Sequence, residues 1–314
     1  MFINATGFYI PSQRINNDYF LHVNGLTSDW IYQRTGIETR SKVSSGENSV
    51  TMGKAAVTNA LEELPYNVKE VDLIISAGYT PQDTVGTLAH SIQREFEIEN
   101  AVSIMVSSAC SSCVNALEIV EGYFASQKAS KALIICSETN SYYNNETDPK
   151  SGHLWGDAAV AFFVSKERIT GDEPEILNVT TRGLGHVGKG PEGVYLSPKD
   201  KGLEMPDGRD VFVNATRYMV DAVNDVTKRS NVAIQNLDYI IAHQANKRII
   251  NNVLHHLDFP ESKSLTNIEK YGNTGSASAF LVMMEHRKRF QKGNLVGITV
   301  FGGGYSSGAT LIRF

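Results

Sequence analysis

Cys110 lies in the segment SSACSSC (107–113), which follows an apolar run and precedes a pattern of helical periodicity. At such a strand-to-helix turn, the unpaired N–H groups and the positive end of the helix dipole favour a thiolate. A thiolate attacks a carbonyl carbon well, and a helix N-terminus can also stabilise an oxyanion. The segment therefore predicts a nucleophile; the alternative is a small buried side chain, as in most free cysteines.

Cys113 gives the same segment two other interpretations. The spacing Cys110-x-x-Cys113 suits a metal or redox pair, but no second pair or His-x-His cluster lies near it. A redox C-x-x-C usually has Pro or Gly between its cysteines, whereas this chain has two serines. The third cysteine, Cys136, lies in an apolar strand and is expected in the core. Whether Cys110 and Cys113 can form a disulfide stays open.

Two further polar residues follow apolar segments and could assist a nucleophile. His243 ends the run LDYIIA (237–242), and Asn273 lies in the glycine-flanked turn YGNTGSAS (271–278). Polar residues at the carboxyl end of a strand lie where α/β sheets place their ligands. Taken singly, His243 could be a core residue and Asn273 a helix cap.

Alternating strand and helix patterns must position these residues. Short β-branched runs predict strands and longer amphipathic segments predict helices, so the chain is expected to be an α/β protein with a buried sheet. The predicted strands are 71–78, 101–108, 131–138, 159–165, 237–244, 294–302 and 309–314. The predicted helices are 49–64, 87–98, 112–127, 210–230 and 276–291.

An internal similarity suggests a duplication. VDLIISAG (71–78) resembles LDYIIAHQ (237–244), and GDAAVAFFVS (156–165) resembles SGATLIRF (307–314). The alternative is that any two buried strands look alike. A boundary in the polar stretch 167–176 would divide the chain into an N-terminal half, 1–168, and a C-terminal half, 169–314.

Composition narrows the class of protein. The 314 residues carry 34 acidic and 29 basic side chains, and 41% are hydrophobic. This balance gives no overall basic footprint for nucleic acid. No apolar run approaches the roughly 18 residues of a membrane span, and the first residues do not form a signal-peptide pattern. Three cysteines are too few for a disulfide scaffold, so we expect a cytoplasmic protein.

The motifs together resemble the β-ketoacyl-acyl-carrier-protein synthase III family of the thiolase superfamily along nearly the whole chain. Besides the Cys110 turn they are DWIYQRTGIETR (29–40), GDAAVAF (156–162), DGRDVF (207–212), HQANKRI (243–249), YGNTGSAS (271–278) and FGGGYSSGATLIRF (301–314). The resemblance implies a duplicated thiolase-like five-layer α-β-α-β-α sandwich that forms a homodimer.

The resemblance also implies an acyltransferase mechanism. Cys110 matches the nucleophile that accepts an acyl group, and His243 and Asn273 match the pair that stabilises the enolate formed when a malonyl thioester loses CO₂. Gly303 matches the glycine whose N–H joins that of Cys110 in an oxyanion hole. No metal or redox cofactor is expected.

Substrate contacts follow from the same resemblance. Trp30 and Arg34 match residues that hold the nucleotide end of coenzyme A, although helix packing and a surface ion pair would also explain them. Asn246 matches a position at the pantetheine tunnel.

Basic residues predict a docking site for acidic acyl-carrier protein. Lys247 and Arg248 match the family's docking position, and Arg209 could add to it. The other basic cluster, HRKRFQK (286–292), is better explained as charge at a helix C-terminus.

The chain also departs from the family pattern. Ser111, Ser112 and Cys113 follow the nucleophile where Ala-Gly-Phe is common, and Val85 lies where a bulky aromatic often closes the acyl pocket across the dimer. A small residue there predicts room for a longer or differently shaped acyl group. Specialised-metabolite biosynthesis, a non-condensing acyltransferase and a silent partner subunit of a heterodimer therefore stay open beside fatty acid biosynthesis.

Overall fold

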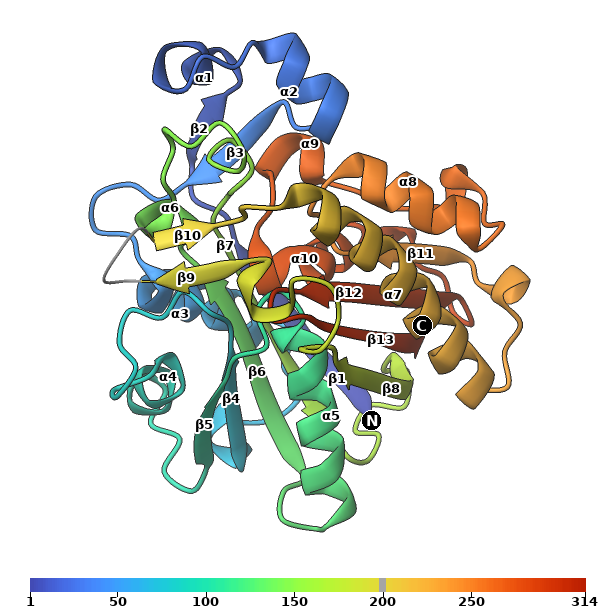
Figure 1. Ribbon diagram of the computed structural model, residues 1–314. Coiled ribbons are helices and arrows are strands. Elements are labelled where there is room, and N and C mark those ends of the chain that lie inside the picture. The colour runs from blue at the N-terminus through green and yellow to red at the C-terminus, as the bar shows by residue number, and fades with distance from the viewer. Residues whose placement is uncertain (198–201) are drawn as a thin grey trace.

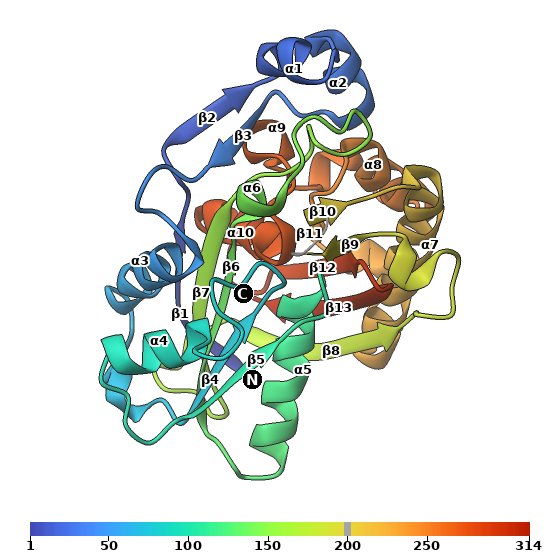
Figure 2. The ribbon, with the colours of Figure 1, turned by 60° about the vertical axis from the view of Figure 1, so that its left-hand side comes forward.

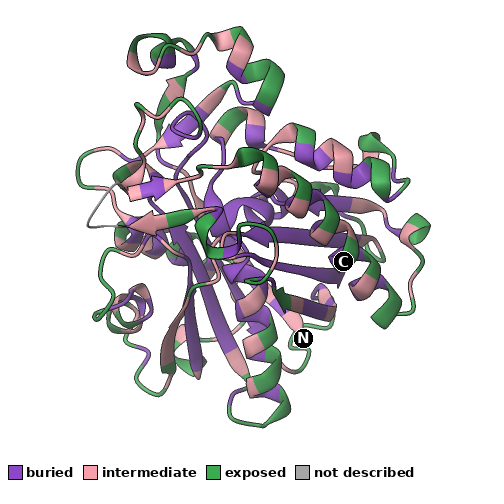
Figure 3. Cartoon of the chain, viewed as in Figure 1, coloured by how far each residue is buried: buried purple, intermediate pink, exposed green. Residues whose placement is uncertain are grey.

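A mixed β-sheet forms the centre of the protein. The computed structural model describes residues 1–197 and 202–314, and within them nine strands follow one another in the order β11-β12-β13-β8-β1-β7-β6-β4-β5 (Figure 1). Most residues of β4, β6, β7, β12 and β13 are buried, whereas the edge strand β5 is more open (Figure 3). Their bounds are β1 (Phe2–Tyr9), β4 (Leu73–Ala77), β5 (Val102–Val106), β6 (Lys131–Glu138), β7 (Ala158–Ser165), β8 (Glu175–Gly183), β11 (Tyr239–Ala242), β12 (Leu295–Gly302) and β13 (Ser306–Arg313).

The sheet consists of two halves with the same pairing pattern. β1, β7, β6 and β4 pair in turn antiparallel, antiparallel and parallel, and β8, β13, β12 and β11 repeat that sequence. The halves meet where Phe2 of β1 pairs with Glu175 of β8. The two pairs of similar segments thus occupy equivalent places, β4 with β11 and β7 with β13. The division into 1–168 and 169–314 remains a prediction.

Helices cover both halves and fill the space between them. α3 (Ser49–Leu61) and α4 (Leu88–Glu95) pack on the N-terminal half, and α7 (Gly208–Arg229) packs on the C-terminal half with α8 (Lys247–His256) beside it. α5 (Ser112–Ala125) and α10 (Ser278–Glu285) contact strands of both halves. Figure 2 shows this arrangement, and it confirms the predicted duplicated five-layer α-β-α-β-α sandwich.

Smaller elements lie around the carboxyl ends of the central strands (Figure 1). They are α1 (Asp18–Val23), α2 (Ser28–Thr35), α6 (Asn140–Tyr143), α9 (Ile268–Tyr271), the ribbon of β2 (Gln13–Asn16) with β3 (Thr39–Lys42), and that of β9 (Tyr195–Ser197) with β10 (Gly202–Glu204). Among the described residues, no helix has the length and apolarity needed to cross a bilayer.

The predicted elements all exist, but their ends differ and several elements were not predicted. The helix expected over 276–291 ends at Glu285, so most of the basic cluster 286–292 lies in and beyond a 3-10 turn at Arg287–Arg289. α8 was missed although its buried residues recur at helical spacing. β8 was missed because its sequence, EILNVTTRG, is largely polar.

Candidate active site

Cys110 lies in a tight turn between β5 and α5. Ala109 adopts a positive φ of 49°, a conformation that non-glycine residues rarely take. The Ser108 N–H donates to Ser112 Oγ at 2.8 Å, and Ser112 Oγ donates to the Ala109 carbonyl at 2.6 Å. Ser111 Oγ lies 2.6 Å from Ser306 Oγ on β13. The two serines that depart from the family pattern therefore fix this turn and join it to the C-terminal half.

The Cys110 thiol is held in its neutral form. It is 8% exposed, and burial raises the pKa of Cys110 to about 12, with a further increase from the charge of Glu138 and a decrease from the Tyr79 hydroxyl. Cys113 is fully buried in α5, and its side chain contacts that of Cys136. All three cysteines are free thiols. Cys113 is thus part of the core.

His243 directly follows β11 and is 3% exposed. Its N–H donates to the Thr299 carbonyl at 2.8 Å, and its Nδ1 lies 2.6 Å from Ser278 Oγ. Ser278 Oγ also accepts from the Gln244 N–H at 3.4 Å. The Ser278 hydroxyl can donate to Nδ1 or accept from it, and when it donates the ring proton lies on Nε2. Burial lowers the pKa of His243 to about 4, so the ring is neutral at pH 7.

Asn273 lies between α9 and a 3-10 turn at Gly275–Ala277, and it is 4% exposed. Its N–H donates to the Leu154 carbonyl at 2.8 Å, and its carbonyl accepts from the Gly156 N–H at 2.9 Å. The Gly275 N–H donates to Asn273 Oδ1 at 3.0 Å. Because Oδ1 is engaged, the amide presents Nδ2 as its donor.

Hydrogen bonds connect Cys110 with the backbone of Asn273. The Cys110 thiol donates to the Tyr79 hydroxyl, with 3.9 Å between sulfur and oxygen, and that hydroxyl donates to Asn140 Oδ1 at 2.8 Å. Asn140 Nδ2 in turn lies 3.4 Å from the Asn273 carbonyl. Ser278, which holds His243, begins the helix that follows the Asn273 turn. These contacts link Cys110 to the Asn273 backbone, and Ser278 connects His243 to the segment after Asn273. The shared catalytic role of the three residues remains a prediction.

The turn between β12 and β13 packs directly against the nucleophile. A Cβ atom on Gly302 would lie 2.7 Å from the Ser108 carbonyl and 2.9 Å from the Cys110 nitrogen. A Cβ on Gly303 would lie 3.6 Å from that of Ala109. The backbone of Gly303 therefore lies beside the Cys110 turn, where the sequence places it.

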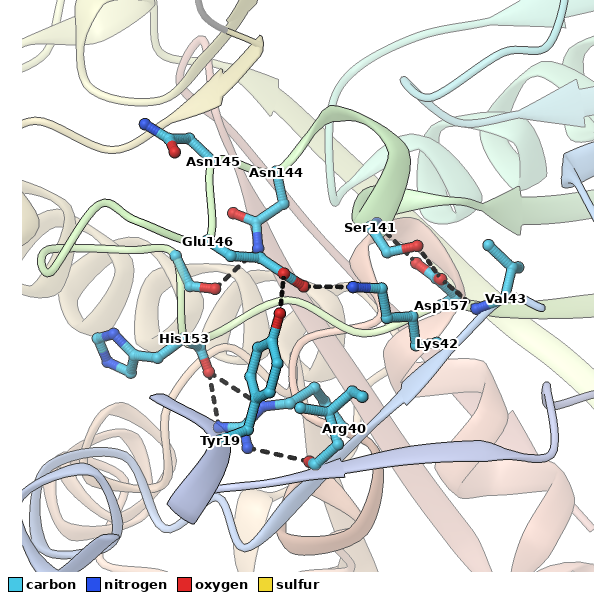
Figure 4. A network of polar contacts seen from close by, with 12 residues as sticks. Tyr19, Arg40, Lys42, Val43, Ser141, Asn144, Asn145, Glu146, His153 and Asp157 are labelled. Carbon is cyan, nitrogen blue, oxygen red and sulfur yellow. Dashed lines mark hydrogen bonds and ion pairs between the residues drawn. The ribbon is translucent and has the colours of Figure 1, made fainter. Parts of the chain in front are cut away.

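A polar network holds the loop that supports Asn273 (Figure 4). Arg40 on β3 donates to the His153 carbonyl at 2.7 and 3.2 Å, and burial lowers the pKa of Arg40 to about 9. Lys42 pairs with Glu146 at 2.6 Å. Asp157 accepts from the Val43 N–H at 2.8 Å. β3 therefore ties down both ends of the loop that pairs with Asn273.

Trp30 and Arg34 lie together on α2. The Arg34 guanidinium lies 4.2 Å from the centre of the Trp30 ring, and the ring meets His153 edge-on at 5.6 Å. Arg34 is exposed and Trp30 is half-buried. α2 ends at Gly36 with a φ of 76°, where a Cβ would lie 2.7 Å from Lys247 Cβ. This close approach sets α2 against the start of α8.

The start of α8 carries three of the predicted carrier contacts. Asn246 caps the helix, because its side chain accepts from the Arg248 N–H at 2.8 Å. Lys247 forms an ion pair with Glu269 of α9, whereas Arg248 is exposed. Arg209, in the first turn of α7, is also exposed. Arg248 and Arg209 are therefore the freer cations.

Val85 is not brought to Cys110 within the chain. It lies in the loop between β4 and α4, 85% exposed, and its N–H donates to Asp83 Oδ1 at 2.7 Å. Its expected contact with the acyl pocket, which would be made across a dimer, remains a prediction.

Sequence reasoning missed four residues that surround the catalytic set: Tyr79, Glu138, Asn140 and Ser278. Glu138 is fully buried and accepts from Ser276 Oγ at 2.5 Å and from the Thr80 N–H at 3.0 Å. Burial raises the pKa of Glu138 to about 7. The internal repeat gave no signal for Tyr79, because aligning Val71 with Leu237 places His243 opposite Ala77 and Tyr79 opposite Ala245.

Comparison with known proteins agrees with this geometry. Two family models match the chain: 3-oxoacyl-[acyl-carrier-protein] synthase III over residues 105–185, and the C-terminal domain of the same enzyme over residues 227–314. The first match contains Cys110, and the second contains His243 and Asn273.

Relatives resemble the chain over its full length. A β-ketoacyl-[acyl-carrier-protein] synthase III of Wolbachia pipientis is 31% identical, covering 100% of this chain and 99% of the relative. The crystal structure of the Aquifex aeolicus 3-oxoacyl-[acyl-carrier-protein] synthase III has a TM-score of 0.92 at 31% identity, covering 100% of this chain and 99% of that one. The priming β-ketosynthase of the R1128 polyketide pathway has a TM-score of 0.90 at 26% identity, covering 99% and 95%. This chain therefore belongs to the β-ketoacyl-[acyl-carrier-protein] synthase III family and has the thiolase fold.

Proposed function

We propose that the protein is a condensing enzyme that loads an acyl group onto Cys110 and joins it to the enolate of a malonyl thioester. The observation that carries this proposal is the buried, neutral ring of His243, which pairs through Nδ1 with the Ser278 hydroxyl. A hydroxyl that donates there leaves Nε2 as a donor for the substrate, beside the amide of Asn273. Such a site offers two neutral hydrogen-bond donors beside a thiol, which suits an enolate that is formed and consumed in place.

The first half of the cycle is acyl loading. The Cys110 sulfur attacks the carbonyl of an acyl thioester, and the N–H groups of Cys110 and Gly303 stabilise the oxyanion. The carbon–sulfur bond to the carrier then breaks. The carrier leaves as a thiol, which gains the proton that Cys110 has lost.

The second half is condensation. His243 Nε2 and Asn273 Nδ2 donate hydrogen bonds to the thioester oxygen of the malonyl group as CO₂ leaves and negative charge gathers there. The enolate carbon attacks the acyl group on Cys110, and the carbon–sulfur bond breaks to release the β-ketoacyl product. A neutral imidazole fits this task because it donates a hydrogen bond to the enolate oxygen and keeps its own proton.

Substrate delivery is part of the proposal. Trp30 and Arg34 bind the nucleotide of coenzyme A by stacking and charge, and Asn246 lies along the pantetheine arm. Arg248 and Arg209, with Lys247 behind them, dock acidic acyl-carrier protein. No metal or redox cofactor takes part, and the setting is the cytoplasm. The names of the relatives support fatty acid biosynthesis as the pathway.

We also propose that the protein is a homodimer. β5 is the outermost strand of the sheet, and Val102 on it is 44% exposed. An open strand edge can pair with a second copy. Such pairing would bring a partner's loop 78–87, which includes Val85, toward the first copy's site.

Intact-protein mass spectrometry tests the reaction. The protein is incubated with a panel of acyl-coenzyme A and acyl-carrier-protein thioesters and then with malonyl-carrier protein. We expect an acyl adduct on the wild type but not on Cys110→Ser, cleared by the malonyl donor with release of CO₂ and a β-ketoacyl product. His243→Ala and Asn273→Ala should load but fail to clear.

The other outcomes separate the alternatives. An adduct that only an alcohol or amine clears would indicate non-condensing acyl transfer. Absence of any adduct would contradict the proposal and favour the silent partner. The acyl group that loads fastest tests fatty acid biosynthesis against a specialised pathway.

A further inference from the structure

The Cys110 sulfur has one hydrogen-bonding side chain among the described residues, and it is a tyrosine. The thiol donates to the Tyr79 hydroxyl across 3.9 Å, and that hydroxyl donates to Asn140 Oδ1 at 2.8 Å. A hydroxyl proton can serve one acceptor at a time. Tyr79 Oη therefore stands between two groups, either of which can receive its proton.

The phenol is held firmly in this place. The Tyr79 N–H donates to Glu138 Oε1 at 3.2 Å, and a Cβ on Gly275 would lie 2.6 Å from Tyr79 Oη. β4, which precedes Tyr79, packs against α5, which follows Cys110 (Figures 1 and 2). Since backbone contacts on both sides fix the ring, the hydroxyl can change its acceptor without a movement of the chain.

The surroundings of Cys110 contain little else that would stabilise a thiolate. Glu138 is negative when ionised, and His243 is neutral at pH 7 because burial lowers its pKa to about 4. The N–H groups of Ser111 and Ser112, at the start of α5, donate to the carbonyls of Ser108 and Ala109. The start of α5 thus stabilises a thiolate through its dipole, but these two N–H groups are not available to the sulfur. A hydroxyl beside the sulfur is the missing partner.

We propose that Tyr79 is a catalytic residue of acyl loading, whose hydroxyl turns from Asn140 Oδ1 to the Cys110 sulfur as the thiol loses its proton. This role rests on the proposed function of Cys110 as acyl acceptor. The thiol proton passes to solvent, the thiolate with the Tyr79 hydrogen bond attacks the thioester carbonyl, and the departing carrier sulfur takes up a proton. The phenol keeps its own proton throughout.

The test measures the reactivity of Cys110 without any acyl substrate. The rate of alkylation by iodoacetamide is followed by mass spectrometry from pH 6 to pH 10, with Cys110→Ser as the blank. In Tyr79→Phe we expect the alkylation rate at each pH in this range to fall about tenfold, because the thiolate loses a hydrogen bond and the pKa of Cys110 rises by about one unit.

Two further variants make the result specific. Tyr143→Phe is the matched control, because the Tyr143 hydroxyl donates to the Pro81 carbonyl at 2.8 Å and not to the sulfur; its profile should match the wild type. Asn140→Leu removes the competing acceptor, so its alkylation rate should rise across the pH range. The fold of each variant is checked by thermal unfolding.

The outcomes decide between the proposal and its failure. An unchanged alkylation rate in a folded Tyr79→Phe would overturn it, and so would an unchanged or lowered rate in Asn140→Leu. Alkylation needs no thioester, so it tests the role of Tyr79 even if the protein accepts no acyl group. In that case a changed alkylation rate in Tyr79→Phe would support the hydrogen bond to Cys110 while the proposed function fails.

Discussion

Individual protonation states in this site follow from burial. Burial lowers the pKa of His243 to about 4, so the ring is neutral at pH 7, and its Nδ1 pairs with the Ser278 hydroxyl. Glu138 has the opposite shift from the same cause, since its charged form is the negative one. The site therefore presents neutral donors in place of fixed charges.

Ser278 is predicted to act as a positioning residue for His243. Ser278→Ala should reduce decarboxylation of a malonyl thioester about tenfold, through loss of one hydrogen bond, and leave acyl loading of Cys110 unchanged. Ser278→Thr, which keeps the hydroxyl, should restore most of the rate. CO₂ release and adduct formation are measured separately. Equal losses in both steps would indicate a general structural defect instead.

Glu138 is predicted to make stability depend on pH. Its pKa in the folded protein is about 7, above its ordinary value of 4.5. The folded state therefore holds this proton more tightly, and the stability it contributes is complete below pH 4.5 and is lost as the pH rises through 7. The size of this change is on the order of 3 kcal/mol.

Urea unfolding of wild type and Glu138→Gln across this pH range measures the effect. The difference between their free energies of unfolding should change with pH. His243 contributes a pH dependence of opposite sign, but both proteins carry His243, so its contribution cancels in the difference. Glu62→Gln, at the exposed end of α3, controls for the loss of one surface carboxylate. Parallel curves for wild type and Glu138→Gln would refute the assignment.

At the scale of elements, the site depends on close contact between the Cys110 turn and the β12–β13 hairpin. Ser111 reaches Ser306, and Gly302 has no side chain where the Cys110 nitrogen approaches. The N-terminal half thus supplies the nucleophile, and the C-terminal half holds it in place.

Gly302→Ala is predicted to displace this turn. Its Cβ would meet the Ser108 carbonyl and the Cys110 nitrogen below 3.0 Å, and backbone atoms can move away only with the turn. We expect a loss of about 1–3 kcal/mol in stability and a slower acyl loading. Gly297→Ala on the same strand is the control, because its nearest contact is the flexible Leu237 side chain at 3.3 Å. Loading by Gly302→Ala at the wild-type rate would argue against this role.

α2 is predicted to distinguish coenzyme A from shorter carriers. Trp30→Ala should raise the KM for acyl-coenzyme A ~5-fold, as expected for loss of stacking and cation–π contact, and leave the KM for acyl-pantetheine unchanged. Tyr32→Ala, an exposed aromatic on the same helix, is the matched control. A similar rise in KM for both substrates would indicate that Trp30 has a structural role and does not bind the nucleotide.

At the scale of the whole molecule, duplication explains where the site lies. The C-terminal ends of β4, β6, β11 and β12 come from two equivalent half sheets and meet around α5 and α10. Residues far apart in the chain therefore face one another. β5 extends only the N-terminal half and leaves a free edge.

We predict that two chains associate through β5. Val102 N–H donates to the Asp72 carbonyl beside β4, so the N–H of the next residue, Ser103, faces the free edge. Ser103→Pro should remove that donor and convert a dimer into monomers, whereas Ser103→Ala should not. Light scattering after size-exclusion chromatography measures the mass. A dimer that persists in Ser103→Pro would place the interface elsewhere.

Much of the site could be predicted because its chemistry lies in local patterns. Cys110 at a strand-to-helix turn and His243 after a buried strand stand where the periodicity of the sequence places them. Tyr79 and Ser278 could not be found in this way. A tyrosine after a strand or a serine in a helix has many ordinary uses, and their importance lies in contacts with residues distant along the chain.

Hydrophobic period and motif order are properties of the chain, so the sequence alone was enough for the fold class and the family, and it predicted a nucleophile with two partners. The protonation states of those groups depend on the tertiary structure. Burial raised the pKa of Cys110 and lowered that of His243, and the packing of two half sheets placed Tyr79 against sulfur. Desolvation and hydrogen bonding depend on which distant atoms exclude water, and that is settled when the two halves meet.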